Sequence, residues 1–101
     1  MTNAVLTLDP EATQFPTTCK VGEDELVVFH TGKAYYAIER WCPHANADLA
    51  EGTLLGDKLK CPRHGFIFRL LDGKGINCPG INVKARELKM EEGRLALQWP
   101  P

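Results

Sequence analysis

Four side chains in the middle of the chain have the types and the spacing of a metal-binding site. Cys42 is followed two positions later by His44, and Cys61 is followed three positions later by His64. Each short segment supplies one cysteine and one histidine, whereas typical zinc fingers place both cysteines in one loop and both histidines in another. The mixed arrangement suits a dinuclear iron centre, in which two cysteines bind one iron and two histidines bind the other.

The other two cysteines, Cys19 and Cys78, allow a competing interpretation, in which the four cysteines form two disulfides of a secreted domain. The first residues lack the basic start and the apolar core of a secretory signal, and two of the cysteines are paired with histidines. Metal ligation is therefore the better interpretation. Cys19 is then expected to be a core position and Cys78 a small buried side chain. A zinc-stabilised interaction module without a redox role stays open as an alternative.

Length and charge set the general class of the protein. A chain of 101 residues has the common size of one domain, so we expect a single domain over 1–101 with its metal-binding part at about 41–68. The net charge of -1 gives no indication of a nucleic acid or an anionic membrane as a partner. No apolar run has the length of a membrane-spanning helix. We expect a cytoplasmic protein that is a monomer.

The segments that must position the four side chains have the pattern of short β-strands. Apolar and aromatic residues in 25–30 and 34–39 flank a turn that contains Gly32, which predicts a hairpin just before Cys42. A shorter hairpin over 52–60 is expected just before Cys61. Further strands are predicted at 4–8, 66–68, 83–90 and 94–99, with a helical turn within 46–51. Many short strands separated by turns predict an all-β sandwich or small barrel of antiparallel strands, with two loops as its metal-binding subdomain.

The sequence resembles the Rieske-type 2Fe-2S ferredoxins. The residues that carry the resemblance are Cys42-Pro43-His44, Cys61-Pro62-Arg63-His64-Gly65, Leu49, Gly52, Gly56-Asp57, Phe66 and Phe68. The resemblance implies one 2Fe-2S cluster in a Rieske-like fold. It also implies that Cys42 and Cys61 bind the buried iron, that His44 and His64 bind the outer iron, and that residues 77–80 form a proline-containing loop covering the cluster.

The resemblance further implies a low reduction potential. High-potential respiratory relatives have an extra cysteine in each box, joined by a disulfide, and a serine and a tyrosine that donate hydrogen bonds to the cluster. In this chain, Arg63 stands at the place of one such cysteine. Phe66 stands at the place of the serine, and Phe68 at the place of the tyrosine. Because hydrogen bonds to the sulfurs tune the potential, their absence implies about -150 to -100 mV. Arg69 replaces an acidic residue often found after the second box, and nothing in the sequence explains that change.

A low-potential carrier of this kind is expected to pass single electrons from a flavin-dependent reductase to a terminal oxygenase of the ring-hydroxylating type. The third histidine, His30, is expected at the surface of a strand, so the chain has no facial triad and we expect an electron-transfer protein rather than an enzyme. The alternative is the small Rieske subunit of a larger reductase, such as an assimilatory nitrite reductase. The expected docking surface includes Pro43, Ala45, Asn46 and Arg63.

The two tryptophans are expected to have packing roles. Trp41 immediately precedes Cys42, so we expect its indole to shield the metal centre. Trp99 closes the last predicted strand and is expected to lie in the core or against a sheet edge.

Overall fold

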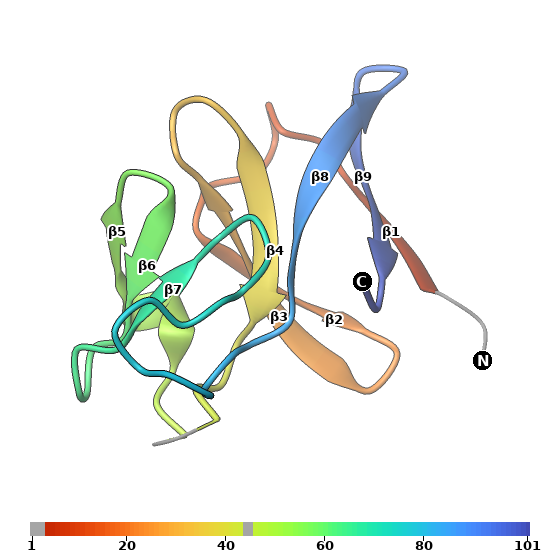
Figure 1. Ribbon diagram of the computed structural model, residues 1–101. Helices are drawn as coiled ribbons and strands as arrows, with labels where there is room; N and C mark the ends of the chain where they lie inside the picture. The colour runs from red at the N-terminus through yellow and green to blue at the C-terminus, as the bar shows by residue number, and fades with distance from the viewer. Residues whose placement is uncertain (1–3, 44–45) are drawn as a thin grey trace.

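The computed structural model describes residues 4–43 and 46–101, and in these residues nine strands form two antiparallel sheets (Figure 1). The larger sheet has the strand order β1-β9-β8-β4-β3-β2, and the smaller has the order β5-β6-β7. In chain order the strands are β1 (Ala4–Leu8), β2 (Thr17–Val21), β3 (Asp24–His30), β4 (Tyr35–Glu39), β5 (Thr53–Leu55), β6 (Lys58–Lys60), β7 (Ile67–Arg69), β8 (Ala85–Glu91) and β9 (Arg94–Trp99). The all-β prediction is confirmed.

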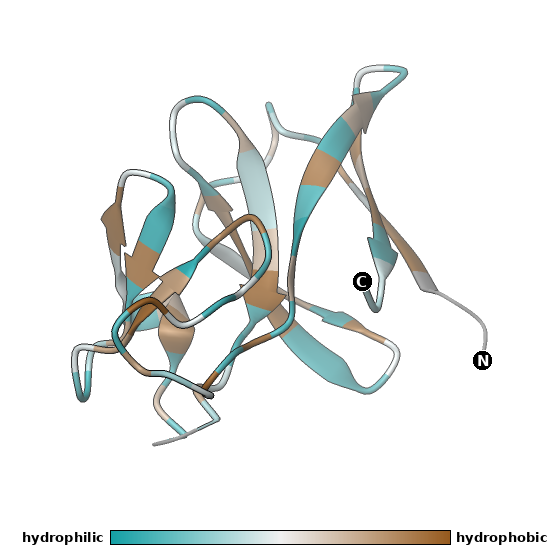
Figure 2. Cartoon of the chain, in the orientation of Figure 1, coloured by the Kyte–Doolittle hydropathy of each residue, from teal (hydrophilic) through white to brown (hydrophobic). Residues whose placement is uncertain are grey.

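The larger sheet is nearly closed into a barrel. Its two edge strands, β1 and β2, come into contact with each other across the gap. Closure of this kind protects the edges of a sheet from pairing with other chains. Along β8, Ala85 packs in one core and Leu88 in the other, and the residues between and after them are exposed, so Figure 2 shows hydrophobic bands separated by hydrophilic ones on this strand. The predicted sandwich or small barrel is therefore found as a barrel-like sheet with a small second sheet beside it.

The strand β3 is buried on both faces and separates two cores. Successive side chains of a strand point to opposite faces, so the apolar run from Leu26 to Phe29 serves both sides. All four side chains of the run are at most 2% exposed. The barrel core consists of Val21, Leu26, Val28, Ala37, Leu88, Leu95, Leu97 and Trp99. The loop-side core consists of Val27, Phe29, Ile38, Cys42, Leu49, Leu59, Cys61, Phe68, Leu70, Cys78, Val83 and Ala85.

The strand β2 was not predicted from the sequence. Its pattern is short and only weakly hydrophobic, because its inward side chains include a threonine and a half-buried cysteine. Pairing with β3, which opposes Cys19 to Leu26, makes this segment a strand. Cys19 packs against the barrel core without being fully buried, and burial raises the pKa of its thiol. The other predicted strands are confirmed, with ends that differ by one or two residues.

The helical turn predicted within 46–51 is a single 3-10 turn, η1 (Leu49–Glu51). Asp48 caps it, because its Oδ1 accepts a hydrogen bond from the Ala50 N–H at 3.0 Å. Within residues 4–43 and 46–101, no helix has the length and hydropathy that crossing a lipid bilayer requires.

Candidate metal centre

The two loops that carry the predicted ligands are closed by the same backbone hydrogen bond. The first ligand loop runs from Cys42 to Ala47, and its first N–H donates to its last carbonyl at 2.9 Å. The second ligand loop runs from Cys61 to Phe66, and the corresponding distance is 2.7 Å. Each cysteine N–H therefore makes the same loop-closing bond to the carbonyl five residues later, although the two loops have different sequences.

The fifth residue of each ligand loop has a left-handed backbone conformation. Asn46 has a φ of 53° and Gly65 a φ of 70°. Glycine and asparagine are the residues that adopt this conformation most readily, so each sequence suits its loop. The Asn46 N–H also donates to the Cys42 carbonyl at 2.7 Å. Sequence reasoning missed this backbone role of Asn46. The position of Asn46, four residues after Cys42, matches that of Gly65 after Cys61, and this equal spacing could have predicted the shared backbone conformation.

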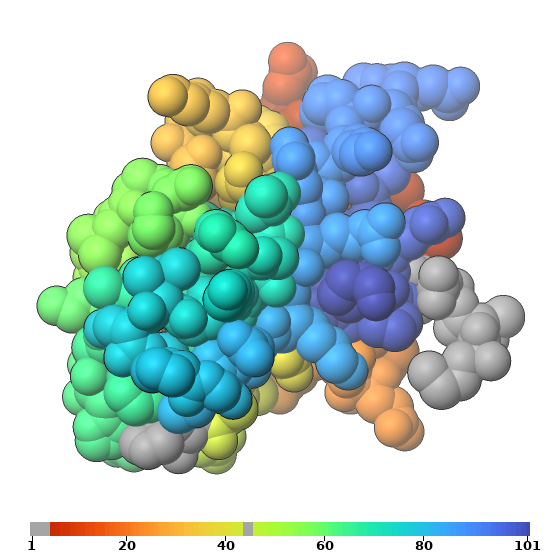
Figure 3. Space-filling model, in the orientation of Figure 1, coloured from red at the N-terminus to blue at the C-terminus, as the bar shows by residue number. Residues whose placement is uncertain are grey.

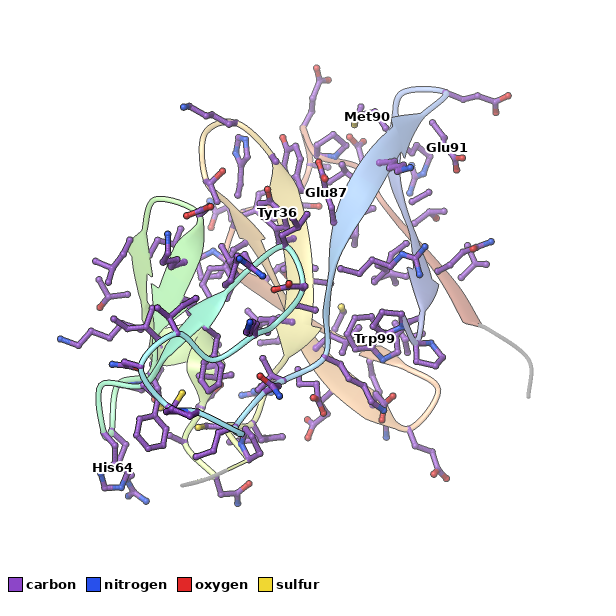
Figure 4. All side chains as sticks on the ribbon, in the orientation of Figure 1. Tyr36, His64, Glu87, Met90, Glu91 and Trp99 are labelled. Carbon is purple, nitrogen blue, oxygen red and sulfur yellow. The ribbon has the colours of Figure 1, made fainter. Side chains whose placement is uncertain are left out.

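The predicted ligands in the described residues divide into buried thiols and an exposed imidazole. Cys42 and Cys61 are each 1% exposed, belong to the loop-side core and form no disulfide. His64 is exposed, and Figure 4 places it at the tip of the second ligand loop, pointing away from the body of the protein. His44 lies outside the described residues. Within residues 4–43 and 46–101, no three His, Cys, Asp or Glu side chains are grouped closely enough to bind a single metal ion.

Three loops meet at this end of the molecule. Asn46 of the first ligand loop and Arg63 of the second line one shallow hollow. Pro43 lines another with Gly80 and Ile81, which belong to the segment that we call the covering loop (residues 77–81). Figure 3 shows the chain around residues 70–80, in cyan, spread over the front of this end. The covering loop thus lies beside the first ligand loop.

Arg40 and Asp48 hold the two ends of the first ligand loop together. The Arg40 Nε and Nη2 donate to the two carboxylate oxygens of Asp48 at 3.1 and 3.0 Å. The Arg40 carbonyl accepts from the Leu49 N–H at 2.6 Å. The hydrogen bonds from Arg40 are the largest cause of a lowered pKa of Asp48. This bidentate, charge-assisted ion pair restricts the movement of the loop that contains Cys42.

Trp41 lies at the surface beside this pair rather than within the loop-side core. Its side chain is 38% exposed, and its Nε1 donates to Glu25 at 2.8 Å. The Arg40 guanidinium lies over the indole, 4.8 Å from the ring centroid, in cation–π contact. The indole thus joins Arg40 and Glu25 in a surface group next to Cys42.

Cys78 is 4% exposed within the loop-side core, which confirms that it is a small buried side chain. A glycine at position 75 makes this packing possible. A Cβ atom on Gly75 would lie 2.6 Å from the Cys78 Sγ and would also clash with the Ile81 carbonyl oxygen. The covering loop can therefore pack against residue 75 only because that residue has no side chain.

Arg69, which the sequence left unexplained, forms an ion pair with Asp72. The Arg69 Nε and Nη2 donate to the two Asp72 oxygens at 3.0 and 2.6 Å. Asp72 also accepts from the Lys74 N–H at 3.1 Å. These hydrogen bonds, those from Arg69 first, lower the pKa of Asp72 to about 2. Arg69 thus stabilises the turn through which the chain leaves β7 toward the covering loop.

Two residues placed outside the site by sequence reasoning do lie outside it. His30 is exposed, and its ring stacks on Tyr35 with the centroids 4.0 Å apart. Trp99 is 1% exposed in the barrel core, and its Nε1 donates to Asp24 at 3.0 Å.

Comparison with known proteins identifies the family. Residues 4–90 match the Rieske [2Fe-2S] domain, so the chain belongs to this family. Ferredoxin CarAc of Metapseudomonas resinovorans is 36% identical over 77 residues, which are 75% of this chain and 72% of that ferredoxin. A chain in a solved complex of reduced oxygenase and oxidized ferredoxin in carbazole 1,9a-dioxygenase has a TM-score of 0.77 and 31% identity, covering 94% of this chain and 93% of that one.

A likeness of fold alone extends further. A structure described as an NADH-dependent nitrite reductase small subunit from Mycobacterium tuberculosis has a TM-score of 0.78, with 98% of this chain and 97% of that one covered. Its sequence identity is 16%, so it carries no functional argument.

As a member of this family, the protein binds one 2Fe-2S cluster. Such a cluster requires thiolate and imidazole donors. The site offers two buried thiols that form no disulfide and one exposed imidazole. The relatives of at least 30% identity that the chain matches along most of their length are ferredoxin components of oxygenase systems, which carry electrons and are not the catalytic subunits. The family match also sets aside the zinc-module alternative.

Proposed function

We propose that this protein carries single electrons from a flavin-dependent reductase to a terminal oxygenase of the ring-hydroxylating type. The observation that supports the proposal most strongly is the match along nearly the whole chain to a ferredoxin that has been solved together with its oxygenase. The exposed position of His64 supports it further, because an electron partner must come close to the outer edge of the cluster.

The proposed ligands are Cys42 and Cys61 for the inner iron and His44 and His64 for the outer iron. When bound, the cluster supplies reversible one-electron chemistry. The chain holds the two thiols in the loop-side core, away from water. It holds the His64 imidazole at the surface, on a loop that begins with the buried Cys61. The site thus has a protected inner side and an accessible outer side.

Reconstitution of electron transfer tests the function. The loaded protein is mixed with a flavin-dependent reductase and an oxygenase encoded in the same organism, and product formation is followed with each component left out in turn. We expect turnover only when all three are present. If the protein instead supports nitrite reduction by a large reductase subunit, and supports no oxygenase, the alternative function replaces this one.

The reduction potential should lie at the low end of the Rieske range, at about -150 to -100 mV. Phe66 and Phe68 offer phenyl rings, which cannot donate hydrogen bonds to cluster sulfur, and Phe68 is fully buried. A potentiometric titration followed by electron paramagnetic resonance measures the midpoint. A value above zero would contradict this prediction.

Arg63→Glu should slow electron transfer to the partners several-fold at low salt and leave the cluster spectrum unchanged. Arg63 is exposed beside the exposed His64, and charges at the rim of an interface act mainly on the association rate. Of the other proposed docking residues, Pro43 and Asn46 are exposed and Ala45 lies outside the described residues. Stopped-flow kinetics at several salt concentrations make the measurement.

Arg94→Glu is the matched control for the docking surface. Arg94 is also exposed, but it lies at the β8–β9 turn, at the end of the protein opposite His64 (Figures 1 and 4). Equal slowing by both variants would remove Arg63 from the docking surface.

The proposal includes a cytoplasmic location and a monomeric carrier that meets its partners transiently. None of the four cysteines forms a disulfide in the structure, which suits a reducing compartment. Gel filtration of the loaded protein with light scattering tests the monomer.

A further inference from the structure

The side chain of Asn77 connects the covering loop to the second ligand loop. Its Oδ1 accepts a hydrogen bond from the Ile67 N–H at 2.8 Å, and its Nδ2 donates to the Gly65 carbonyl at 3.0 Å. A residue of a neighbouring parallel strand would make the same two bonds on either side of Phe66. The Asn77 amide therefore imitates a strand partner for the backbone that directly follows His64.

This backbone segment is held from two sides. On one side, the Phe66 carbonyl accepts from the Cys61 N–H and closes the second ligand loop. On the other side, the Asn77 amide bonds to the residues before and after Phe66. Movement of Asn77 would therefore displace the backbone that directly follows the proposed ligand His64 and that closes the loop onto Cys61.

The residues on either side of Asn77 are also fixed. The Ile76 N–H donates to the Ile67 carbonyl at 2.8 Å. Cys78 is buried in the loop-side core, against the residue where only glycine fits. The start of the covering loop is thus fixed in three ways: by the backbone bond of Ile76, by the side-chain bonds of Asn77 and by the packing of Cys78 in the loop-side core.

We propose that Asn77 is a positioning residue that fixes the distance between the covering loop and the second ligand loop, and thereby limits the access of water to the cluster. The inference rests on the ligand assignment made above for Cys61 and His64. Solvent exposure and hydrogen bonding around an iron–sulfur cluster set its potential, so a loosened cover must change a measurable property.

Asn82 provides a matched control within the same part of the chain. It is an exposed asparagine just beyond the other end of the covering loop, and its Oδ1 also accepts a backbone hydrogen bond, from the Gly75 N–H at 3.1 Å. That bond joins two parts of the 74–83 segment and does not reach a ligand loop. Asn82→Ala therefore removes the same chemistry without releasing the second ligand loop.

The test compares the loaded Asn77→Ala and Asn82→Ala proteins with the unchanged protein, with no electron partner present. Hydrogen exchange followed by mass spectrometry should show exchange about tenfold faster in the peptide containing residues 65–67 for Asn77→Ala alone. The midpoint potential of Asn77→Ala should rise, because water stabilises the more negative reduced cluster and alanine adds no charge. Unchanged exchange and potential in Asn77→Ala, or equal changes in Asn82→Ala, would overturn the proposal.

Asn77→Asp keeps the test informative if Asn77→Ala fails to retain the cluster. Aspartate preserves an oxygen that can accept from the Ile67 N–H and removes the donor to Gly65. Loss of the cluster in Asn77→Ala, with retention in Asn77→Asp and Asn82→Ala, supports the proposal. Loss in all three would overturn it, because the effect would not depend on the Asn77 bonds. Failure of the proposed function would appear separately, in the reconstitution assay with partners.

Discussion

Replacing Cys61 by serine is expected to give a folded protein without a 2Fe-2S cluster. Iron content should fall from about two atoms per chain to near zero, and the visible and paramagnetic resonance spectra of the cluster should disappear. The reason is that iron–sulfur clusters in this family are held by thiolates, and an alcohol oxygen in the core is a poor replacement. Iron and sulfide analysis with the two spectra makes the measurement.

Cys78→Ser is the control for this experiment. Cys78 lies in the same loop-side core as Cys61 and is nearly as buried, at 4% against 1% exposed. Cys78 is not one of the proposed ligands, and serine is close to cysteine in size, so the substitution takes no donor from the cluster. Cys78→Ser should therefore keep its iron. An iron-loaded Cys61→Ser protein, or an iron-free Cys78→Ser protein, would show that the ligand assignment is wrong.

Replacing Trp99 by alanine is expected to reduce the free energy of unfolding by about 3–5 kcal/mol. Trp99 is 1% exposed and is the largest side chain in the barrel core, so its removal leaves a cavity that its neighbours cannot fill. A domain of this size has about 5–15 kcal/mol in total, so the loss is a large fraction. Urea denaturation followed by circular dichroism measures it.

The same experiment tests the separation of the two cores. Trp99→Phe keeps a six-membered aromatic ring but removes the five-membered ring with the N–H that donates to Asp24, so it should lose less, about 2 kcal/mol. Val5→Ala, at a side chain that is 64% exposed, should change stability by less than about 0.5 kcal/mol. Neither tryptophan variant should shift the midpoint potential while folded. A shifted potential in Trp99→Ala would mean that the barrel core acts directly on the metal centre.

Features carried by neighbouring residues were predictable from the sequence. The pairing of cysteine with histidine in each loop identified the kind of metal centre. The closing hairpin was readable from Glu92-Gly93, and both of these residues have positive φ angles, as a two-residue hairpin turn requires. The apolar run 26–29 predicted a strand, although not that its two faces serve different cores.

Features that depend on contacts between distant segments were not predictable. The Arg40–Asp48 pair spans the first ligand loop, and the Asn77 amide meets a backbone ten residues earlier. No local pattern distinguishes such an arginine or asparagine from an ordinary surface residue. Arg69 is a different case, because its partner Asp72 is only three residues away, but the sequence does not show that the turn after β7 brings the two side chains together.

The division of the core by β3 has a consequence for how the protein matures. The barrel core contains none of the cysteines at positions 42, 61 and 78, so its burial of apolar surface does not depend on a supply of iron. We expect a newly made chain to close its barrel before the cofactor is inserted, because this core needs no cluster ligand. The ligand loops should then pack against Val27, Phe29 and Ile38 as the cluster is inserted, so cluster assembly is expected to be the last step in building this protein.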